Sequence, residues 1–358
     1  MTVDELQKLI THQFFADRAS PKKAAGRALG ALVELVTYYK LVSWGFQNQI
    51  IIENKIAEFG RPKITHNVEF SIHKVQSQTV KAFDKSKLPL TASKFGKLTG
   101  LTPNKSRTAL SKNGLYRNSS EFIENEKNST IANISSHDKT TITLNITQLL
   151  KHPSVIIECK RVGVEEGMKK GPQSIEKAKQ GAYVARSVSS LQKVTIADGT
   201  PLYFNPAKPK GNPINVTTFL ENIAKGRQLD SEISDFVMTV GIVSNHGNWF
   251  TSNNMNKELK VLAHSYDWLL FLTDQGLSTF VKECLVKDTI ISNAFRNSHD
   301  KHMPSEKMTK VTLPIEAHFE LLKYFSTNDK ATDSWFNILT PRALSIAELK
   351  QSMKTLVN

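Results

Sequence analysis

The chain has 358 residues, enough for one large core with additions or for two or three compact units. Its hydrophobic share of 39% and charged share of 22% are ordinary for a globular protein, and they exclude a collagen, a coiled coil and a disordered chain. The formal net charge of +14 attracts polyanions, and we expect nucleic acid as the partner, since no basic amphipathic anchor stands at either end.

Two cysteines, Cys159 and Cys284, are too few for a disulfide framework, which favours a reducing compartment. The opening stretch MTVDELQKLITHQFF carries acids where a signal peptide needs a basic region and an apolar run. No apolar stretch approaches the ~18 residues of a membrane span. We therefore predict a cytoplasmic protein with no membrane partner.

Residues 1–75 are predicted to form a helical scaffold followed by strands. Ser20 and Pro21 are typical of a helix start, and the apolar residues that follow recur at helical spacing up to a stop at Gly60. The next stretch, KITHNVEFSIHKV, is rich in β-branched and aromatic residues, which predicts one or two strands.

Residues 76–130 form a basic region in which the stretch from Thr91 to Leu115 predicts a short helix, a break at Gly100 and a second helix over 103–113. This pattern resembles a helix-turn-helix motif, which would place Lys105, Ser106 and Arg107 against DNA. A solvated basic hairpin of helices would give the same pattern.

Residues 131–300 carry the core in our prediction. TTITLNI and SVIIECKRV are predicted as two strands joined by a turn at TQLLKHP, and a helix over PQSIEKAKQGAYVARSVSSL follows. SDFVMTVGIVSN predicts a further core strand, and WLLFLTDQGLSTFVKECL a strand running into a helix. Strands interleaved with helices predict an α/β (α+β) fold with a central mixed sheet flanked by helices. Residues 301–358 are predicted to extend this core.

The strand SVIIECKRV carries the candidate chemistry. Its period of two places Ile156, Glu158 and Lys160 on one face, and the other face is apolar and should pack into the core. Hydrolysis of a phosphodiester is assisted by a hard cation such as Mg²⁺, which takes carboxylate and carbonyl oxygens. A second carboxylate is therefore needed near Glu158.

Asp138 is the only aspartate between residues 85 and 157, and it precedes the strand TTITLNI. If the two predicted strands are neighbours, Asp138, Glu158 and the backbone carbonyl of Cys159 can share a cation. Lys160 would then hold the attacking water or neutralise the developing charge.

Together these residues resemble the signature of the PD-(D/E)XK nuclease superfamily, in particular type II restriction endonucleases. That signature is an acid, a gap, and then an acid and a lysine one residue apart on an adjacent strand, here Asp138, Glu158 and Lys160. The resemblance covers roughly residues 130–290. It implies a mixed sheet flanked by helices and Mg²⁺-dependent hydrolysis that leaves 5′-phosphate and 3′-hydroxyl ends. His137 stands where the family has proline, and the alternative acids are Glu121, Glu124 and Glu126.

The helix after the catalytic strand carries Gln180 and Tyr183, which resemble a Gln and Tyr pair found after the lysine in some branches of the superfamily. With Lys177, they are predicted to contact the DNA backbone or to support the site. Lys169 and Lys170, beside Gly171, either contact phosphate or solvate a loop.

We therefore expect a type II restriction endonuclease that cuts double-stranded DNA as a homodimer, because two copies of one site cut two strands symmetrically. A cognate DNA methyltransferase would be its genetic partner. Two alternatives stay open. One is a repair or recombination nuclease of the same superfamily, and the other is a non-catalytic helix-turn-helix regulator in which Glu158 and Lys160 form a structural ion pair.

Overall fold

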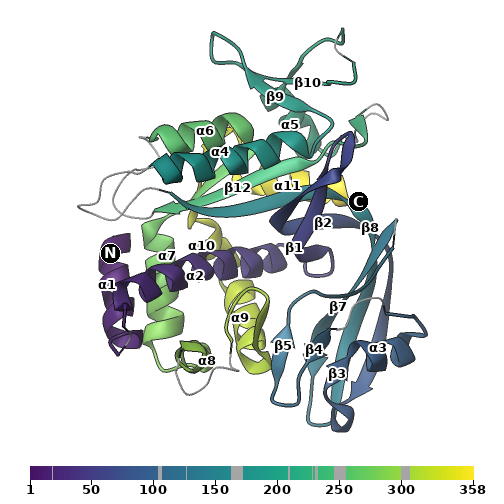
Figure 1. Cartoon of the computed structure of the whole chain (residues 1–358), viewed down its shortest axis with the longest axis vertical. Helices are drawn as coiled ribbons and strands as arrows, with labels where there is room; N and C mark the ends of the chain where they lie inside the picture. The colour runs from purple at the N-terminus through teal and green to yellow at the C-terminus, as the bar shows by residue number, and fades with distance from the viewer. Residues whose placement is uncertain are drawn as a thin grey trace.

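The computed structural model describes residues 1–17, 19–103, 107–125, 127–162, 172–208, 210–227, 229, 233–245, 255–299 and 307–358. Within them, a mixed sheet of eight strands lies at the centre, in the order β1-β2-β8-β12-β13-β15, with β7 and β6 added beside β8 (Figure 1). Its strands are β1 (Ile50–Glu58), β2 (Arg61–Asp84), β6 (Ser120–Glu124), β7 (Asn128–His137), β8 (Thr141–Val162), β12 (Met238–Asn245), β13 (Trp268–Leu272) and β15 (Phe336–Thr340). The predicted fold class is confirmed.

Strand β8 is the central strand of this sheet, because its two halves pair with two different strands. Its first half pairs antiparallel with β7, from His137 opposite Ile142 onwards. Its second half pairs parallel with β12, from Met238 opposite Val155 onwards. Strand β2 runs antiparallel along both halves. Residues far apart in the sequence therefore meet along one strand.

The turn predicted at TQLLKHP is wrong, since TTITLNI and SVIIECKRV belong to the single strand β8. Pro153 lies within the strand opposite His73, where the register between β2 and β8 shifts. Proline cannot donate to a ladder hydrogen bond, and an irregular step in the register accommodates it.

Helices cover both faces of the second half of β8 (Figure 1). Helices α4 (Pro172–Ser187) and α6 (Lys257–Ser265) lie on one side, and α2 (Pro21–Ser43) lies on the other. The remaining helices are α1 (Val3–Phe14), α5 (Val216–Ala224), α7 (Asp274–Phe280) with η3 (Val281–Val286), α8 (Ile290–His299), α9 (Ile315–Thr327), α10 (Asp329–Asp333) and α11 (Ile346–Val357). No helix formed by the described residues has the length and apolar character needed to cross a membrane.

Two small sheets complete the fold. One consists of β9 (Gln192–Thr195), β10 (Pro201–Phe204) and β11 (Ile214–Asn215). The other consists of β3 (Leu90–Thr91), β4 (Thr108–Leu110), β5 (Leu115–Arg117) and β14 (Thr312–Pro314), beside η1 (Lys85–Lys87) and α3 (Ala92–Thr99).

Two helices predicted in the N-terminal third of the chain need correction. The predicted first helix of the helix-turn-helix segment is present as α3, but the second is wrong, because β4 and β5 form a hairpin whose Leu110 and Tyr116 are buried opposite each other. The predicted helical stretch up to Gly60 is also wrong beyond Ser43. The residues from Ile50 onwards are rich in β-branched side chains and pair with β2.

Candidate functional site

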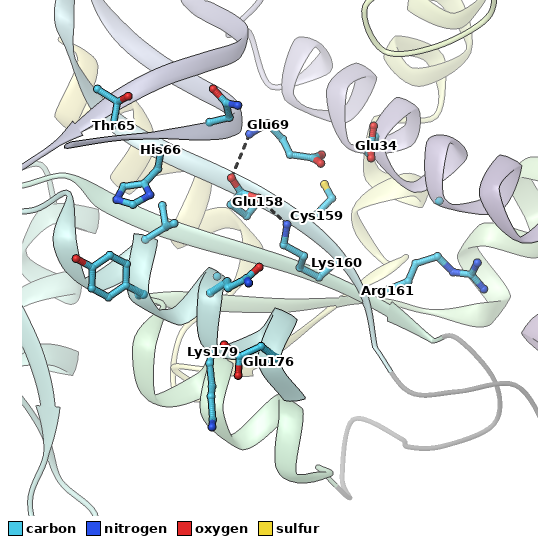
Figure 2. Close-up of a pocket in the computed structure, with 16 residues that line it drawn as sticks. Glu34, Thr65, His66, Glu69, Glu158, Cys159, Lys160, Arg161, Glu176 and Lys179 are labelled. Atoms are coloured by element: carbon cyan, nitrogen blue, oxygen red, sulfur yellow. Dashed lines mark hydrogen bonds and ion pairs between the residues drawn. The ribbon is translucent and has the colours of Figure 1, made fainter. Parts of the chain in front are cut away.

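Strands β2 and β8 part at one point of the sheet. Their pairing ends at Phe70 opposite Ile157, beyond which β2 pairs only with β1, while β8 continues beside β12 with Glu158 opposite Gly241. A cleft of about 1120 Å³ lies at this fork, lined by residues of α2, β2, β8 and α4 (Figure 2). We call it the fork cleft.

Glu158 and Lys160 lie on the same face of β8, as predicted. Ile156, two residues before Glu158, packs against Val184 and Val188, and on the opposite face Cys159 donates a hydrogen bond from Sγ to Thr37 Oγ1 at 3.4 Å. Because both faces are covered, the strand gives Glu158 and Lys160 a rigid platform.

The carboxylate of Glu158 is held by two donors. Its Oε1 accepts the backbone N–H of Glu69 at 3.2 Å, and its Oε2 accepts Lys160 Nζ at 3.0 Å. The N–H of Glu69 is free for this bond because β2 has left β8. A buried carboxylate needs such donors, so the fork itself fixes the orientation of Glu158.

Glu69 supplies a second carboxylate to the fork cleft. Its Oε2 is buried without a hydrogen-bond partner and lies 3.5 Å from Lys310 Nζ. Burial, followed by the negative charge of Glu34, raises the pKa of Glu69 to about 8. Figure 2 shows its side chain extending toward Glu34. A buried oxygen of this kind is stabilised by a bound cation or by a proton.

Lys160 is an ammonium at neutral pH. Burial alone would lower its pKa, but the charge of Glu158 and the hydrogen bond to it raise the pKa above its ordinary value. The side chain is 38% exposed, so its remaining protons can reach the solvent-filled cleft.

Helix α4 closes one side of the fork cleft with Gln180 and Tyr183. Tyr183 donates from its hydroxyl to Glu58 Oε1 at 2.7 Å, and His66 Nε2 lies 2.9 Å from the same oxygen. Hydrogen bonds from Tyr183 and His66 hold the pKa of Glu58 below its ordinary value. Of the two roles predicted for Tyr183, this contact favours support of the site.

Gly181 lets α4 approach the sheet beside Lys160. A Cβ atom at this position would lie 3.3 Å from Tyr266 Oη and 3.8 Å from Lys160 Cε. Tyr266 is 1% exposed, and its hydroxyl has no hydrogen-bond partner among the described residues. The absence of a side chain at Gly181 thus keeps space next to the ammonium.

Asp138 is not in the fork cleft, and the predicted pairing of Asp138 with Glu158 is wrong. Asp138 lies in the turn before β8, where its carboxylate accepts the backbone N–H groups of Thr140 and Thr141, each at 2.8 Å. Thr141 begins β8, so on the order of 50 Å of continuous strand separates the turn from Glu158. These backbone hydrogen bonds hold the pKa of Asp138 below its ordinary value and make it a turn residue.

Among the alternative acids that the structure describes, Glu121 does not line the fork cleft. Glu121 is buried in β6, which pairs with β7 along the other half of the sheet. Glu126 and the side chain of Glu124 lie outside the described residues. The acid that was missed, Glu69, had a recognisable signal, since it is the only acidic residue between Glu58 and Asp84 and lies within a predicted strand.

Most of the predicted DNA contacts are outside the part of the chain that the structure describes: Lys105, Ser106, Lys169, Lys170 and the side chain of Lys177. Arg107 precedes β4, and its carbonyl accepts the N–H of Ala92 at 2.8 Å. It therefore lies at the edge of the small four-stranded sheet and is not among the residues that line the fork cleft.

The oxygen donors of the fork cleft suit a hard cation. Among the described residues, no three His, Cys, Asp or Glu side chains are grouped so that they could hold one metal ion. Two carboxylates, Glu69 and Glu158, and the main-chain carbonyl of Cys159 line the cleft. Oε2 of Glu69 accepts no hydrogen bond from the described residues and lies 3.5 Å from Lys310 Nζ, and an oxygen of this kind suits a hard cation.

Comparisons with models of known protein families, with curated proteins and with solved structures found no match for this chain.

Proposed function

We propose that the chain is a Mg²⁺-dependent endonuclease of the PD-(D/E)XK type that hydrolyses phosphodiester bonds of double-stranded DNA. The observation that carries this proposal is the fork cleft, in which Glu158 and Lys160 share one face of β8 and Glu69 reaches the same cleft from β2. This arrangement supports the proposal, in which Glu69 takes the place of Asp138 as the first acid of the signature.

Glu69, Glu158 and the carbonyl of Cys159 are the groups that would hold the cation. When bound, the cation would polarise a phosphoryl oxygen and lower the pKa of a coordinated water. Glu158 is already oriented for this role by the N–H of Glu69 at 3.2 Å. Burial keeps its carboxylate away from competing water.

Lys160 would bind the scissile phosphate and orient the attacking water. Among the described residues its ammonium donates one hydrogen bond, to Glu158, which leaves two protons to neutralise charge that develops on the phosphate oxygens. Gln180, on the opposite wall, supplies an amide for the DNA backbone.

The net charge of +14 supports a polyanionic substrate. We extend the proposal to a type II restriction enzyme that acts as a homodimer, leaves 5′-phosphate and 3′-hydroxyl ends, and is encoded with a DNA methyltransferase. A repair or recombination nuclease of the same superfamily is the second candidate. The hypothesis of a DNA-binding regulator depended on a second helix over 103–113, and the strand β4 lies within that range.

Incubation of plasmid DNA with the purified protein, with Mg²⁺ or with a chelator, tests the proposal. Glu158→Gln and Lys160→Met should each slow cleavage by about 100-fold or more while DNA binding persists, because each removes a group that acts on the reacting phosphate. The control is Lys225→Met, which breaks an ion pair with Glu221 on α5 and should cut normally.

The products separate the remaining hypotheses. Discrete Mg²⁺-dependent fragments identify a restriction enzyme, and cleavage confined to ends or junctions identifies a repair nuclease. Sequence-specific binding without cleavage under any divalent metal identifies a regulator and overturns the proposal.

A further inference from the structure

Lys310 inserts its ammonium among three carboxylates beside the fork cleft. Its Nζ lies 2.7 Å from Glu34 Oε2, 3.5 Å from Glu69 Oε2 and 3.7 Å from Glu53 Oε1. The acids come from α2, β2 and β1, and the Lys310 side chain is only 7% exposed. One buried ammonium therefore forms ion pairs with carboxylates from three elements.

The main chain around Lys310 is fixed on both sides. Asn118 donates from Nδ2 to the carbonyl of Lys310 and from its backbone N–H to the carbonyl of Val311, each at 2.9 Å. Thr309 Oγ1 accepts the backbone N–H groups of Val311 and Thr312, each at 3.2 Å. The position of the ammonium is thus built into the fold and does not depend on a mobile surface side chain.

The ammonium of Lys310 already places one positive charge against Glu69. Its Nζ lies 2.7 Å from Glu34 Oε2 and 3.5 Å from Glu69 Oε2, so it contacts both carboxylates. A divalent ion bound between Glu34 and Glu69 would lie beside this ammonium and would be repelled by it. Glu158, which lines the same cleft, remains as the partner of Glu69 for one divalent ion.

We infer that Lys310 takes the place of a second metal ion, so that the fork cleft binds a single divalent cation at Glu69 and Glu158. This inference rests on the proposed function. In two-metal sites the ions lie ~3.5–4 Å apart and are bridged by acidic ligands. Here Glu69 Oε2 lies 3.5 Å from the ammonium of Lys310, so one positive group is already beside this acidic ligand.

The test is to count bound Mn²⁺ per chain by electron paramagnetic resonance, without DNA. The wild-type protein should bind one ion. Lys310→Met vacates a space lined by Glu34, Glu53 and Glu69 and should raise the count to two, whereas Lys310→Arg keeps the positive charge and should leave it at one.

Lys40 offers a matched control for the loss of a buried lysine. Its side chain is 2% exposed and bridges Asp329 at 2.8 Å and Asp333 at 2.7 Å, outside the fork cleft. Lys40→Met should therefore lower stability without changing the Mn²⁺ count from one.

A wild-type count of two or of zero overturns the inference, as does a folded Lys310→Met protein that still binds one ion. If Lys310→Met does not fold, the inference is judged on the other two proteins. It then requires one bound Mn²⁺ ion in both the wild-type protein and Lys310→Arg, and any other count overturns it. Plasmid cleavage by the same preparations separates the two proposals. Cleavage with two bound ions refutes only the role of Lys310, and one bound ion with no cleavage of any DNA refutes only the nuclease.

Discussion

The ion pair between Glu158 and Lys160 combines a buried carboxylate with an ammonium that water can reach. Removing one partner of a fully buried pair costs ~3–5 kcal/mol, but solvent screening reduces pairs with an exposed member to about 1 kcal/mol or less. With its side chain 38% exposed, Lys160 is closer to the second case. The Lys160→Met variant should therefore fold. A loss of its cleavage activity would then be caused by the missing ammonium and not by unfolding.

The sequence was sufficient to find Glu158 and Lys160 because a strand period of two is a local property. Glu69 was not found in this way, since 89 residues separate it from the carboxylate that its N–H contacts. Lys310 lies farther still along the chain. Which strands fork, and which distant loop reaches the fork, depends on pairing registers that no local pattern encodes.

His73 makes the stability of the protein sensitive to acid. Its buried ring lies 2.8 Å from the carbonyl of Leu150 through Nδ1 and 2.7 Å from Ser71 Oγ through Nε2, and burial lowers its pKa to about 4. The unfolded chain, with the ordinary value of 6.5, binds the proton more readily between these values. Stability from this group is full above pH 6.5 and falls as the pH drops toward 4.

Urea denaturation at a series of pH values measures this effect. His73→Gln should show a smaller loss of unfolding free energy over the acid range than the wild-type protein. His12→Gln, an exposed position in α1, is the control and should keep the wild-type slope. An unchanged slope in His73→Gln would contradict the assignment.

At the scale of elements, β8 shows why the second acid was misassigned. Pro153 is typical of a turn, and a turn there would have brought Asp138 beside Glu158. The strand instead continues through Pro153, because the shift in the register opposite His73 absorbs the missing donor. The helices α2 and α4 were easier to predict, since their apolar spacing and start signals are local.

The packing of α6 and β13 on β12 depends on the absence of a side chain at Gly241, which pairs with Glu158. A Cβ atom there would lie 2.8 Å from Leu269 Cδ1 and 3.1 Å from the ring of Tyr266. Gly241→Ala should therefore lower the unfolding free energy by about 1–3 kcal/mol through overpacking.

Thermal or urea denaturation tests this estimate. Gly26→Ala is the control, because Gly26 lies within α2 and its added Cβ would be 3.5 Å from the nearest atom, Nε2 of Gln7 in α1, which is an ordinary contact. It should be neutral or stabilising by up to ~1 kcal/mol, as alanine favours helices over glycine. Equal stability losses in the two variants would contradict the packing argument.

At the scale of the whole molecule, the predicted layers were confirmed, since alternating strands and helices restrict a chain to few architectures. The net charge of +14 is a property of the whole chain and not of any single helix or strand. If this charge serves DNA binding, counterions released from the phosphates must contribute to the affinity.

The affinity of Glu158→Gln for a labelled duplex, measured by fluorescence anisotropy without divalent ions, should fall steeply with salt. Six or more phosphate contacts predict a loss of about 1,000-fold between about 50 and 200 mM salt. An affinity that salt does not change would indicate that the positive charge has another purpose.

The most direct test of the account compares plasmid cleavage by Glu69→Gln and Asp138→Asn in the presence of Mg²⁺. Glu69 lines the fork cleft beside Glu158, whereas Asp138 only closes a turn at the far end of β8. Glu69→Gln should cut at least about 100-fold more slowly than the wild-type protein, and Asp138→Asn should cut at the wild-type rate. A fully active Glu69→Gln enzyme, or loss of cleavage in a folded Asp138→Asn protein, would contradict the account.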